Sequence, residues 1–228
     1  YSVAWIDCLA KGKNLGRSVL VLGEHAKEGG LEIELKESVS VPFNTPSALL
    51  NNMTMKAFNS VYWQKTKHKK YQTIPLMQYF YPLDAIGNWN KLYGKAGFLQ
   101  FQCVIPKSDG VANMRMLLTE VAKSGEGSFL AVLKQFGKAN DNFLSFPAEG
   151  YTLALDFKLN PSTLQTVSRL EAMTVDMGGR LYLAKDAVMQ ETTFKTTYPN
   201  WERFEAVRKQ YGAIDKFSSA QSQRLGLA

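Results

Sequence analysis

Few residues in this sequence have the types and spacing that catalysis requires. The sequence contains two histidines, His25 and His68, and two cysteines, Cys8 and Cys103, and their spacings do not match a zinc site. It also lacks glycine-rich phosphate loops and the G-x-S-x-G turn of serine hydrolases. The sequence therefore favours neither a metal site nor a serine nucleophile, and we expect both cysteines to be reduced and buried.

Polar side chains occur within otherwise apolar stretches that we expect to be strands. Gln100 and Gln102 alternate with apolar residues, Lys134 and Asp156 lie in two further stretches of this kind, and Lys185 lies at the end of another. An unpaired buried charge costs several kcal/mol, so such residues usually line a polar pocket. The alternative is that this side of an antiparallel sheet simply faces water. The residues alone leave both interpretations open.

Aromatic residues are frequent in the same region. Core packing explains each of them, whereas a pocket for a sugar ring or an isoprenoid would combine an apolar body with a few hydrogen-bonding groups. Composition does not separate the two. These residues are Tyr79, Phe80, Tyr81, Trp89, Tyr93, Phe98, Phe101 and Phe136.

The elements that must position these residues follow from apolar periodicity. Strands are expected over residues 2–9, 18–22 and 31–39. Thr45 has the type of an N-cap residue, and the proline after it predicts the start of a helix that runs to about residue 63. A lysine-rich segment around His68 then follows.

Two strand–helix–strand units follow in succession. The sequence thus predicts an α+β fold with ferredoxin-like split βαβ units on a largely antiparallel sheet, helices on one face, and the early strands extending that sheet. A C-terminal helical segment to about residue 211 and a basic tail around Arg224 complete the chain. The expected units are strand 98–105, helix 111–122 and strand 129–136, then strand 151–157, a helix capped by Asn160 and opened by Pro161, and strand 180–184.

Bulk properties agree with a folded protein. The chain has 228 residues, 45% of them apolar, which is enough for a full core. No apolar run approaches the roughly 20 residues of a membrane span. The net charge is +7, and a local basic loop containing Lys65, Lys67, Lys69 and Lys70 explains part of it as well as a binding face does. Because the first residue is Tyr1 rather than Met, we expect this chain to start within a longer protein.

Eight short stretches occur in a fixed order along nearly the whole chain. They are residues 1–7 (YSVAWID), 81–84 (YPLD), 89–90 (WN), 93–94 (YG), 96–102 (AGFLQFQ), 129–137 (FLAVLKQFG), 144–147 (LSFP) and 178–186 (GGRLYLAKD). As an ordered set they resemble the C-terminal half of FAD-linked oxidases of the vanillyl-alcohol-oxidase type, in particular the decaprenylphosphoryl-ribose oxidases. In such enzymes one domain holds FAD and a second domain caps the flavin ring.

The resemblance implies a division of the chain and a reaction. Residues 1–186 would form the substrate (cap) domain, and residues 187–228 a helical segment that returns toward a flavin domain absent from this chain. The family oxidises a secondary hydroxyl, here of a sugar or a polyprenyl-phosphate sugar, by hydride transfer to FAD. We expect the chain by itself to be inactive, because FAD would be held mainly by the absent domain.

The resemblance also assigns roles to individual residues. Lys185 would act beside the flavin, where an ammonium stabilises negative charge on the reduced ring, or it would position the substrate. Some family members carry a cysteine where this sequence has Ala154, so position 154 offers no thiol and the lipid-linked substrate stays open. The other substrate-site residues implied are Gln100, Gln102, Lys134 and Asp156, with Tyr81, Phe136 and Trp5 as walls.

Partners and alternatives complete the expectations. The resemblance implies a small-molecule or lipid-linked sugar substrate, a reductase partner that completes an epimerisation, no nucleic acid, and a cytoplasmic location with membrane association as the alternative. A sugar-lactone or hydroxy-acid oxidase of the same fold, or a non-catalytic binding domain, stays open. An RNA-binding ferredoxin-like module is a further alternative, since residues 97–101 half-match the RNA-recognition signature, although residues 94–96 break it.

Overall fold

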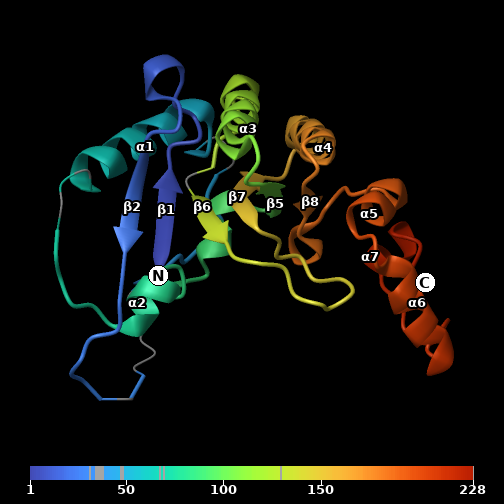
Figure 1. Cartoon of the computed structure of the whole chain (residues 1–228). Coiled ribbons are helices and arrows are strands. Elements are labelled where there is room, and N and C mark those ends of the chain that lie inside the picture. Colours follow the sequence, from blue (N-terminus) through green and yellow to red (C-terminus); the bar gives the residue numbers. More distant parts are fainter. Residues whose placement is uncertain are drawn as a thin grey trace.

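A computed structural model describes residues 1–30, 32–33, 39–46, 49–66, 68, 70–128 and 130–227 of the chain. Its centre is a six-stranded sheet in the order β2-β1-β6-β7-β5-β8, and each neighbouring pair is antiparallel (Figure 1). A two-stranded parallel pair, β3 (Val39–Ser40) and β4 (Ile86–Gly87), stands apart. The six strands are β1 (Ser2–Ile6), β2 (Ser18–Leu22), β5 (Phe98–Pro106), β6 (Ala131–Phe136), β7 (Gly150–Lys158) and β8 (Arg180–Leu181).

Helices accompany this sheet, so the α+β class is confirmed. Within the described part of the chain, no helix is both long enough and apolar enough to cross a bilayer. The α-helices are α1 (Asn52–Thr66), α2 (Leu76–Phe80), α3 (Gly110–Ser124), α4 (Pro161–Asp176), α5 (Glu191–Thr197), α6 (Trp201–Gln210) and α7 (Ala220–Arg224). Short 3-10 helices are η1 (Gly12–Asn14), η3 (Trp89–Tyr93) and η4 (Leu183–Lys185).

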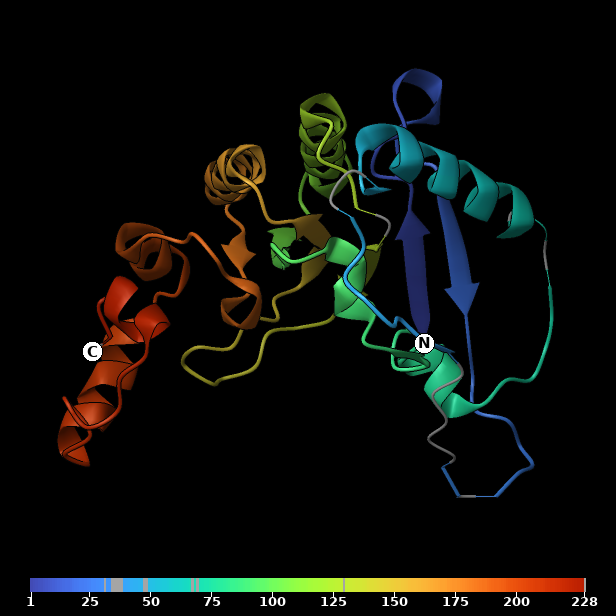
Figure 2. The same ribbon diagram turned by 180° about the vertical axis from the view of Figure 1, so that it is seen from behind.

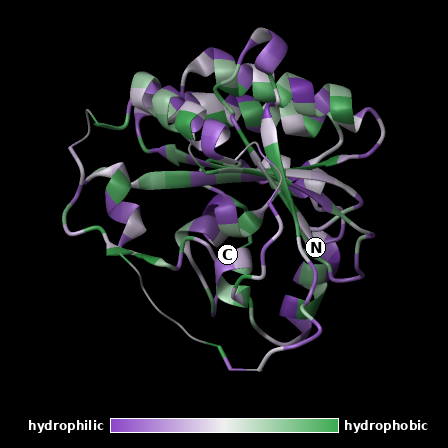
Figure 3. Cartoon of the chain, turned by 90° about the vertical axis from the view of Figure 1, so that its left-hand side faces the viewer, coloured by the Kyte–Doolittle hydropathy of each residue, from purple (hydrophilic) through white to green (hydrophobic). Residues whose placement is uncertain are grey.

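The core lies between the sheet and helices α3 and α4. Along β5 every second side chain points toward these helices, and Phe101, Cys103 and Ile105 are at most 2% exposed. Leu117 of α3 and Leu170 of α4 are completely buried in the same cluster. Strands appear largely hydrophobic in Figure 3, whereas the helices carry both kinds of residue, as expected where one helix face packs on a sheet. The two-residue alternation of β5 therefore sends its polar side chains to the opposite face.

The opposite face is not free of helices, contrary to the expectation that all helices lie on one face. The rings of Trp5 in β1 and Tyr62 in α1 are 4.7 Å apart. Trp5 pairs with Val132, which pairs with Ala154 of β7, so α1 covers the β1 end of the face that α3 and α4 leave open. Figure 2 shows α1 from this side.

The C-terminal helices α5, α6 and α7 lie beyond β8 at the other end of the sheet (Figure 1). The Tyr198 hydroxyl donates a hydrogen bond of 2.6 Å to the Leu181 carbonyl, and Phe194 and Tyr198 are fully buried. The helical segment after β8 thus shares the core with the sheet. The boundary at residue 186 stays a prediction.

Two expected boundaries were wrong. The first helix begins at Asn52 rather than residue 46, because the Asn51 side chain accepts backbone hydrogen bonds from Met53 and Thr54, and Thr45 donates instead to the Leu92 carbonyl. The strand expected over 180–184 is limited to β8, and a 3-10 turn follows it. The basic tail around Arg224 contains helix α7.

Other expected elements are confirmed by the structure or lie outside the described residues. Strands β1 and β2 extend the central sheet as expected, with β2 at its edge. Asn160 caps α4, since its side chain accepts a hydrogen bond of 2.8 Å from the Thr163 backbone. Most of the strand expected over 31–39 lies outside the described residues, as do Phe129, Lys67 and Lys69.

Candidate functional site

Two glutamines of β5 bind side chains of the neighbouring strand β7. Gln100 is the direct cross-strand partner of Asp156, and its Nε2 donates to Asp156 Oδ1 at 2.8 Å. Gln102 Nε2 donates to Thr152 Oγ1 at 3.0 Å. Side chains two residues apart on a strand share a face. Both pairs therefore lie side by side on the sheet face opposite α3 and α4.

Further predicted site residues extend this row of polar groups across the sheet. In β6, Lys134 pairs with Thr152 and Phe136 pairs with Gly150, so both point to the same face as the glutamines. Lys134 is exposed and Phe136 half-buried. Trp5 also points to this face, at its α1 end. We call this surface the polar face, defined by Gln100, Gln102, Lys134, Thr152 and Asp156.

Lys185 reaches the polar face from the end of η4. The turn is attached to β5, because the Tyr182 N–H donates to the Gln102 carbonyl at 2.8 Å and the Lys185 N–H to the Tyr182 carbonyl at 2.9 Å. Burial lowers the pKa of Lys185 below its ordinary value, the Asp156 carboxylate opposes this, and the Lys134 ammonium adds to it. Both charged groups are therefore close enough to act on the Lys185 amine.

Asp156 is the buried carboxylate of this cluster, with only 5% of its surface exposed. Burial raises its pKa, and the hydrogen bond from Gln100 and the charge of Lys185 oppose that rise. Tyr93 of η3 is 2% exposed, and burial raises the pKa of its phenol, with the Asp156 charge adding to the rise. A titratable carboxylate and a titratable amine therefore lie together in a partly dry environment, which is typical of functional sites.

The segment between β6 and β7 covers one end of the polar face. The Phe146 ring stacks on Tyr182 at 4.7 Å and meets the Phe136 ring edge-on at 5.8 Å. Arg180 fixes the same segment through a 2.9 Å hydrogen bond from Nη1 to the Ser145 carbonyl. The aromatic wall expected from Phe136 is thus shared with Phe146 and Tyr182.

Tyr81 lies apart from the other predicted site residues. It follows α2 directly, is 52% exposed, and its ring lies 6.4 Å from that of Phe80. The contacts of the described residues do not join it to the polar face. Its expected role as a pocket wall stays a prediction.

Two further residues take part in the cluster: Thr152, which the sequence analysis missed, and Tyr93, which it named only among the aromatic residues. Thr152 accepts the hydrogen bond of Gln102, and Tyr93 lies beside Asp156. Thr152 could have been found, because it precedes Asp156 by four positions on a strand and must therefore share its face. The place of Tyr93 near Asp156 could not be predicted, because it depends on the irregular segment around η3.

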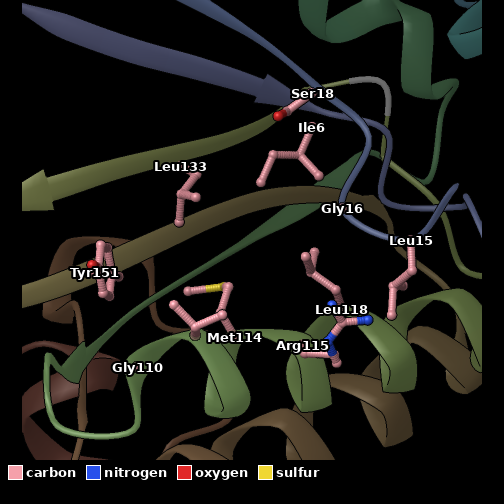
Figure 4. A pocket seen from close by; sticks show the side chains of 11 residues that line it. Ile6, Leu15, Gly16, Ser18, Gly110, Met114, Arg115, Leu118, Leu133 and Tyr151 are labelled. Atoms are coloured by element: carbon pink, nitrogen blue, oxygen red, sulfur yellow. The ribbon is translucent and has the colours of Figure 1, made fainter. Parts of the chain in front are cut away.

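A cavity of about 320 Å³ lies on the other side of the sheet, between α3 and strands β1 and β6 (Figure 4). Its apolar lining includes Ile6, Leu133, Met114 and Leu118, and Arg115 lies at its side. Leu133 faces α3, whereas its neighbour Lys134 faces away from it. The cavity is therefore separated from the polar face by the thickness of the sheet.

Both cysteines are reduced and buried, as expected. Burial raises the pKa of Cys8 to about 12 and that of Cys103 to about 11, so neither is a thiolate at neutral pH. Among the residues that the structure describes, no group of three or more His, Cys, Asp or Glu side chains is arranged to hold a metal ion.

Comparison with known proteins finds one matching family model and two similar proteins. Residues 138–225 match the family model described as D-arabinono-1,4-lactone oxidase. Among individual proteins, the whole chain is 32% identical over 236 residues to decaprenylphosphoryl-beta-D-ribose oxidase of Mycolicibacterium smegmatis, of which it covers 51%. It is also 24% identical over 245 residues to a Streptomyces coelicolor protein described as "Uncharacterized protein in mprA 5'region", of which it covers 66%.

The two findings agree with the ordered stretches of the sequence. The resemblance to the C-terminal part of an FAD-linked oxidase is confirmed, and the chain is similar to part of an oxidoreductase. The chain spans about half the length of the first relative and about two thirds of the second.

Proposed function

We propose that this chain is the substrate-binding and C-terminal portion of an FAD-dependent oxidoreductase that oxidises a secondary hydroxyl of a sugar or a polyprenyl-phosphate sugar. The observation that carries the proposal is the cluster of Gln100, Asp156 and Lys185 on the polar face. Similarity to decaprenylphosphoryl-beta-D-ribose oxidase supports it. FAD, when bound, supplies the acceptor for the hydride.

The donor groups of the polar face suit such a substrate. Amide and ammonium groups donate to sugar hydroxyls and to the polar edge of a flavin ring, and a sheet face holds them rigidly. Lys185 would hold its proton at Nζ and direct positive charge toward the oxygen or ring edge where negative charge develops. Asp156 would orient Gln100 and counter the charge of Lys185. The sequence offers no phosphate loop, so the FAD pyrophosphate would be held by another domain.

We also propose that the segment from β5 to β8 is a ferredoxin-like unit that serves as the platform for this site. In chain order it reads β5-α3-β6-β7-α4-β8, and in the sheet the strands stand in the order β6-β7-β5-β8. Split βαβ units produce this kind of interleaved order. The unit leaves one sheet face to its helices and the other to the polar side chains.

A second candidate is a sugar-lactone oxidase of the same fold. The match of residues 138–225 to the D-arabinono-1,4-lactone oxidase family favours it, and this range contains both Asp156 and Lys185. A hydroxy acid would also fit the polar groups. Steady-state oxidation by the full-length enzyme of a polyprenyl-phosphate sugar, a free lactone and a hydroxy acid separates these substrates.

The Lys185→Ala substitution in the full-length enzyme tests the proposed role of the amine. Flavin reduction in a stopped-flow experiment should slow by about 10²-fold or more, the usual effect of losing one preorganised charge-stabilising donor. The control is Lys123→Ala, because Lys123 is exposed on α3, on the far side of the sheet. A rate of the Lys185→Ala enzyme within about threefold of wild type would show that the amine has no part in reduction.

A further inference from the structure

Asp186, the residue after Lys185, is the centre of a hydrogen-bond network. Its side chain is only 2% exposed. Its Oδ1 accepts the backbone N–H groups of Val188 and Met189 at 3.0 and 2.8 Å. These bonds fix the chain direction immediately after η4, but they use only one of the two carboxylate oxygens.

The second oxygen binds side chains that come from α7, more than thirty residues later in the chain. Arg224 Nη2 donates to Asp186 Oδ2 at 2.8 Å and Gln221 Nε2 donates to the same oxygen at 3.1 Å. Gln221 Nε2 also donates to the Leu183 carbonyl at 2.6 Å, and Arg224 Nη1 donates to the Met189 carbonyl. Helix α7 therefore holds the turn on both sides of Lys185.

The position of α7 is itself fixed by contacts. A helix of five residues is not stable alone, so tertiary contacts must hold it. Leu225, directly after the helix, is 2% exposed and belongs to the core. A capping box between Ser219 and Ser222 closes its first turn. The network around Asp186 thus joins an anchored helix to the turn that carries the amine.

We propose that Arg224 and Gln221 are positioning residues, which hold the Leu183–Asp186 turn so that the Lys185 amine stays beside Asp156 on the polar face. The inference rests on the proposed function for its effect on rate, but not for its effect on Lys185 itself. Removing Arg224 leaves the Asp186 carboxylate buried without its charged partner, which strongly favours rearrangement of the turn.

The experiment uses the full-length enzyme with FAD bound and three variants: Arg224→Ala, Arg224→Lys and Gln221→Leu. Flavin reduction in a single turnover should slow by about tenfold or more in Arg224→Ala, with substrate affinity changed much less, because misplacing a group costs rate. Arg224→Lys should recover part of the loss, since it keeps the charge but not the planar fork of donors. Gln223→Ala is the matched control, because Gln223 lies on the same helix and its side chain bonds to Ser218.

A second measurement reads the position of the amine without relying on catalysis. Competitive acylation of lysines at several pH values, followed by mass spectrometry, gives the pKa of Lys185 in each variant. Since burial is the main cause of its lowered pKa, loosening the turn should raise that pKa toward its ordinary value in Arg224→Ala and Gln221→Leu. It should stay unchanged in Gln223→Ala.

The two measurements separate the possible failures. An unchanged pKa of Lys185 in the Arg224 and Gln221 variants overturns the positioning role, whatever happens to the rate. If the pKa rises but Lys185→Ala itself reduces flavin normally, the positioning role holds and the proposed function of Lys185 fails. Should Arg224→Ala not fold, Arg224→Lys and Gln221→Leu decide the question by the same readouts.

Discussion

At the scale of single residues, Asp156 has the most unusual environment of the polar face. Its carboxylate is almost fully buried, and its pKa is raised although Gln100 and Lys185 both favour its charged form. The cost of burial thus exceeds the gain from both partners. The folded protein tolerates this cost at a position where the proposed function needs a negative charge, which is a common compromise between stability and activity.

The Asp156→Asn substitution should therefore stabilise the protein in a pH-dependent manner. In the unfolded chain an aspartate has its ordinary pKa of about 3.9. In the folded chain burial raises the pKa of Asp156, so it keeps its proton to higher pH. Between these two values the folded state binds more protons, so the free energy of unfolding falls as the pH rises. Asparagine cannot ionise, so the Asp156→Asn protein does not lose this part of the free energy of unfolding. The gain should appear above about pH 4 and level off above the folded pKa.

Urea unfolding at a series of pH values checks this prediction. Asp141→Asn serves as the control, because Asp141 is exposed in the segment between β6 and β7. A gain for Asp156→Asn that does not grow with pH, or a loss at neutral pH, would mean that Asp156 is stabilised as a carboxylate after all.

The sequence predicted part of this site and not the rest. Strand alternation was sufficient to place Gln100 and Gln102 on one face, because the period of a strand is fixed by its backbone. The approach of Lys185 to Asp156 could not be predicted in this way. It depends on η4, where the strand expected over 180–184 gives way to a 3-10 turn held by side chains from α7.

At the scale of elements, regular periodicity was the reliable signal. The sequence predicted β5, α3 and the start of α4 to within two residues, since each has a full apolar stripe and α4 also has a capping residue. The predicted start of α1 was wrong because two possible N-cap residues lie close together in the sequence. Asn51 accepts the backbone hydrogen bonds of the first turn, whereas the Thr45 side chain donates to the Leu92 carbonyl. Local signals of similar strength are decided by tertiary contacts.

The cap of α4 gives an element-level prediction. Asn160→Ala should lower the free energy of unfolding by about 1 kcal/mol, because the Thr163 N–H loses its acceptor. Urea unfolding followed by tryptophan fluorescence measures the change. Gln165→Ala, on the exposed face of the same helix, should differ little from wild type. Equal effects of the two substitutions would contradict a specific cap.

The end of the β5–β7 strand pair gives a second prediction at the scale of elements. A Cβ at Gly150 would lie 2.0 Å from the Ile105 carbonyl oxygen, so Gly150→Ala must push the two strands apart. We expect a loss of about 1–3 kcal/mol in the free energy of unfolding. Gly137→Ala is the control, since a Cβ there meets nothing within 4 Å. A Gly150→Ala protein as stable as this control would show that the strand ends separate freely.

At the scale of the whole molecule, the proposed function makes this chain one side of a site. Its polar face carries donors and a carboxylate, while the sequence has no loop for a cofactor pyrophosphate. The chain covers 51% of the length of its oxidase relative. The proposed function therefore requires the polar face to meet a flavin held by another domain.

The isolated polypeptide should accordingly purify without flavin. Helix N-termini with glycine-rich loops are the usual binding sites for dinucleotide phosphates, and this sequence contains no such fingerprint. Visible absorbance of the purified polypeptide, and titration with added FAD, measure this directly, with the full-length protein as the positive control. A yellow polypeptide with nearly one equivalent of flavin would show that the polar face and its surroundings bind the cofactor unaided.

The pairing of β1 with β6 affects the order in which the chain can be assembled during translation. Ala4 pairs with Leu133, so the inner edge of β1 has no partner until more than a hundred further residues have left the ribosome. At roughly 5–20 residues per second this takes on the order of ten seconds. Throughout that time the β1–β2 hairpin presents an open edge next to the exposed Leu20 and Leu22 side chains. An unpaired strand edge is a template for pairing with another chain, so the nascent chain is open to aggregation until β6 is made.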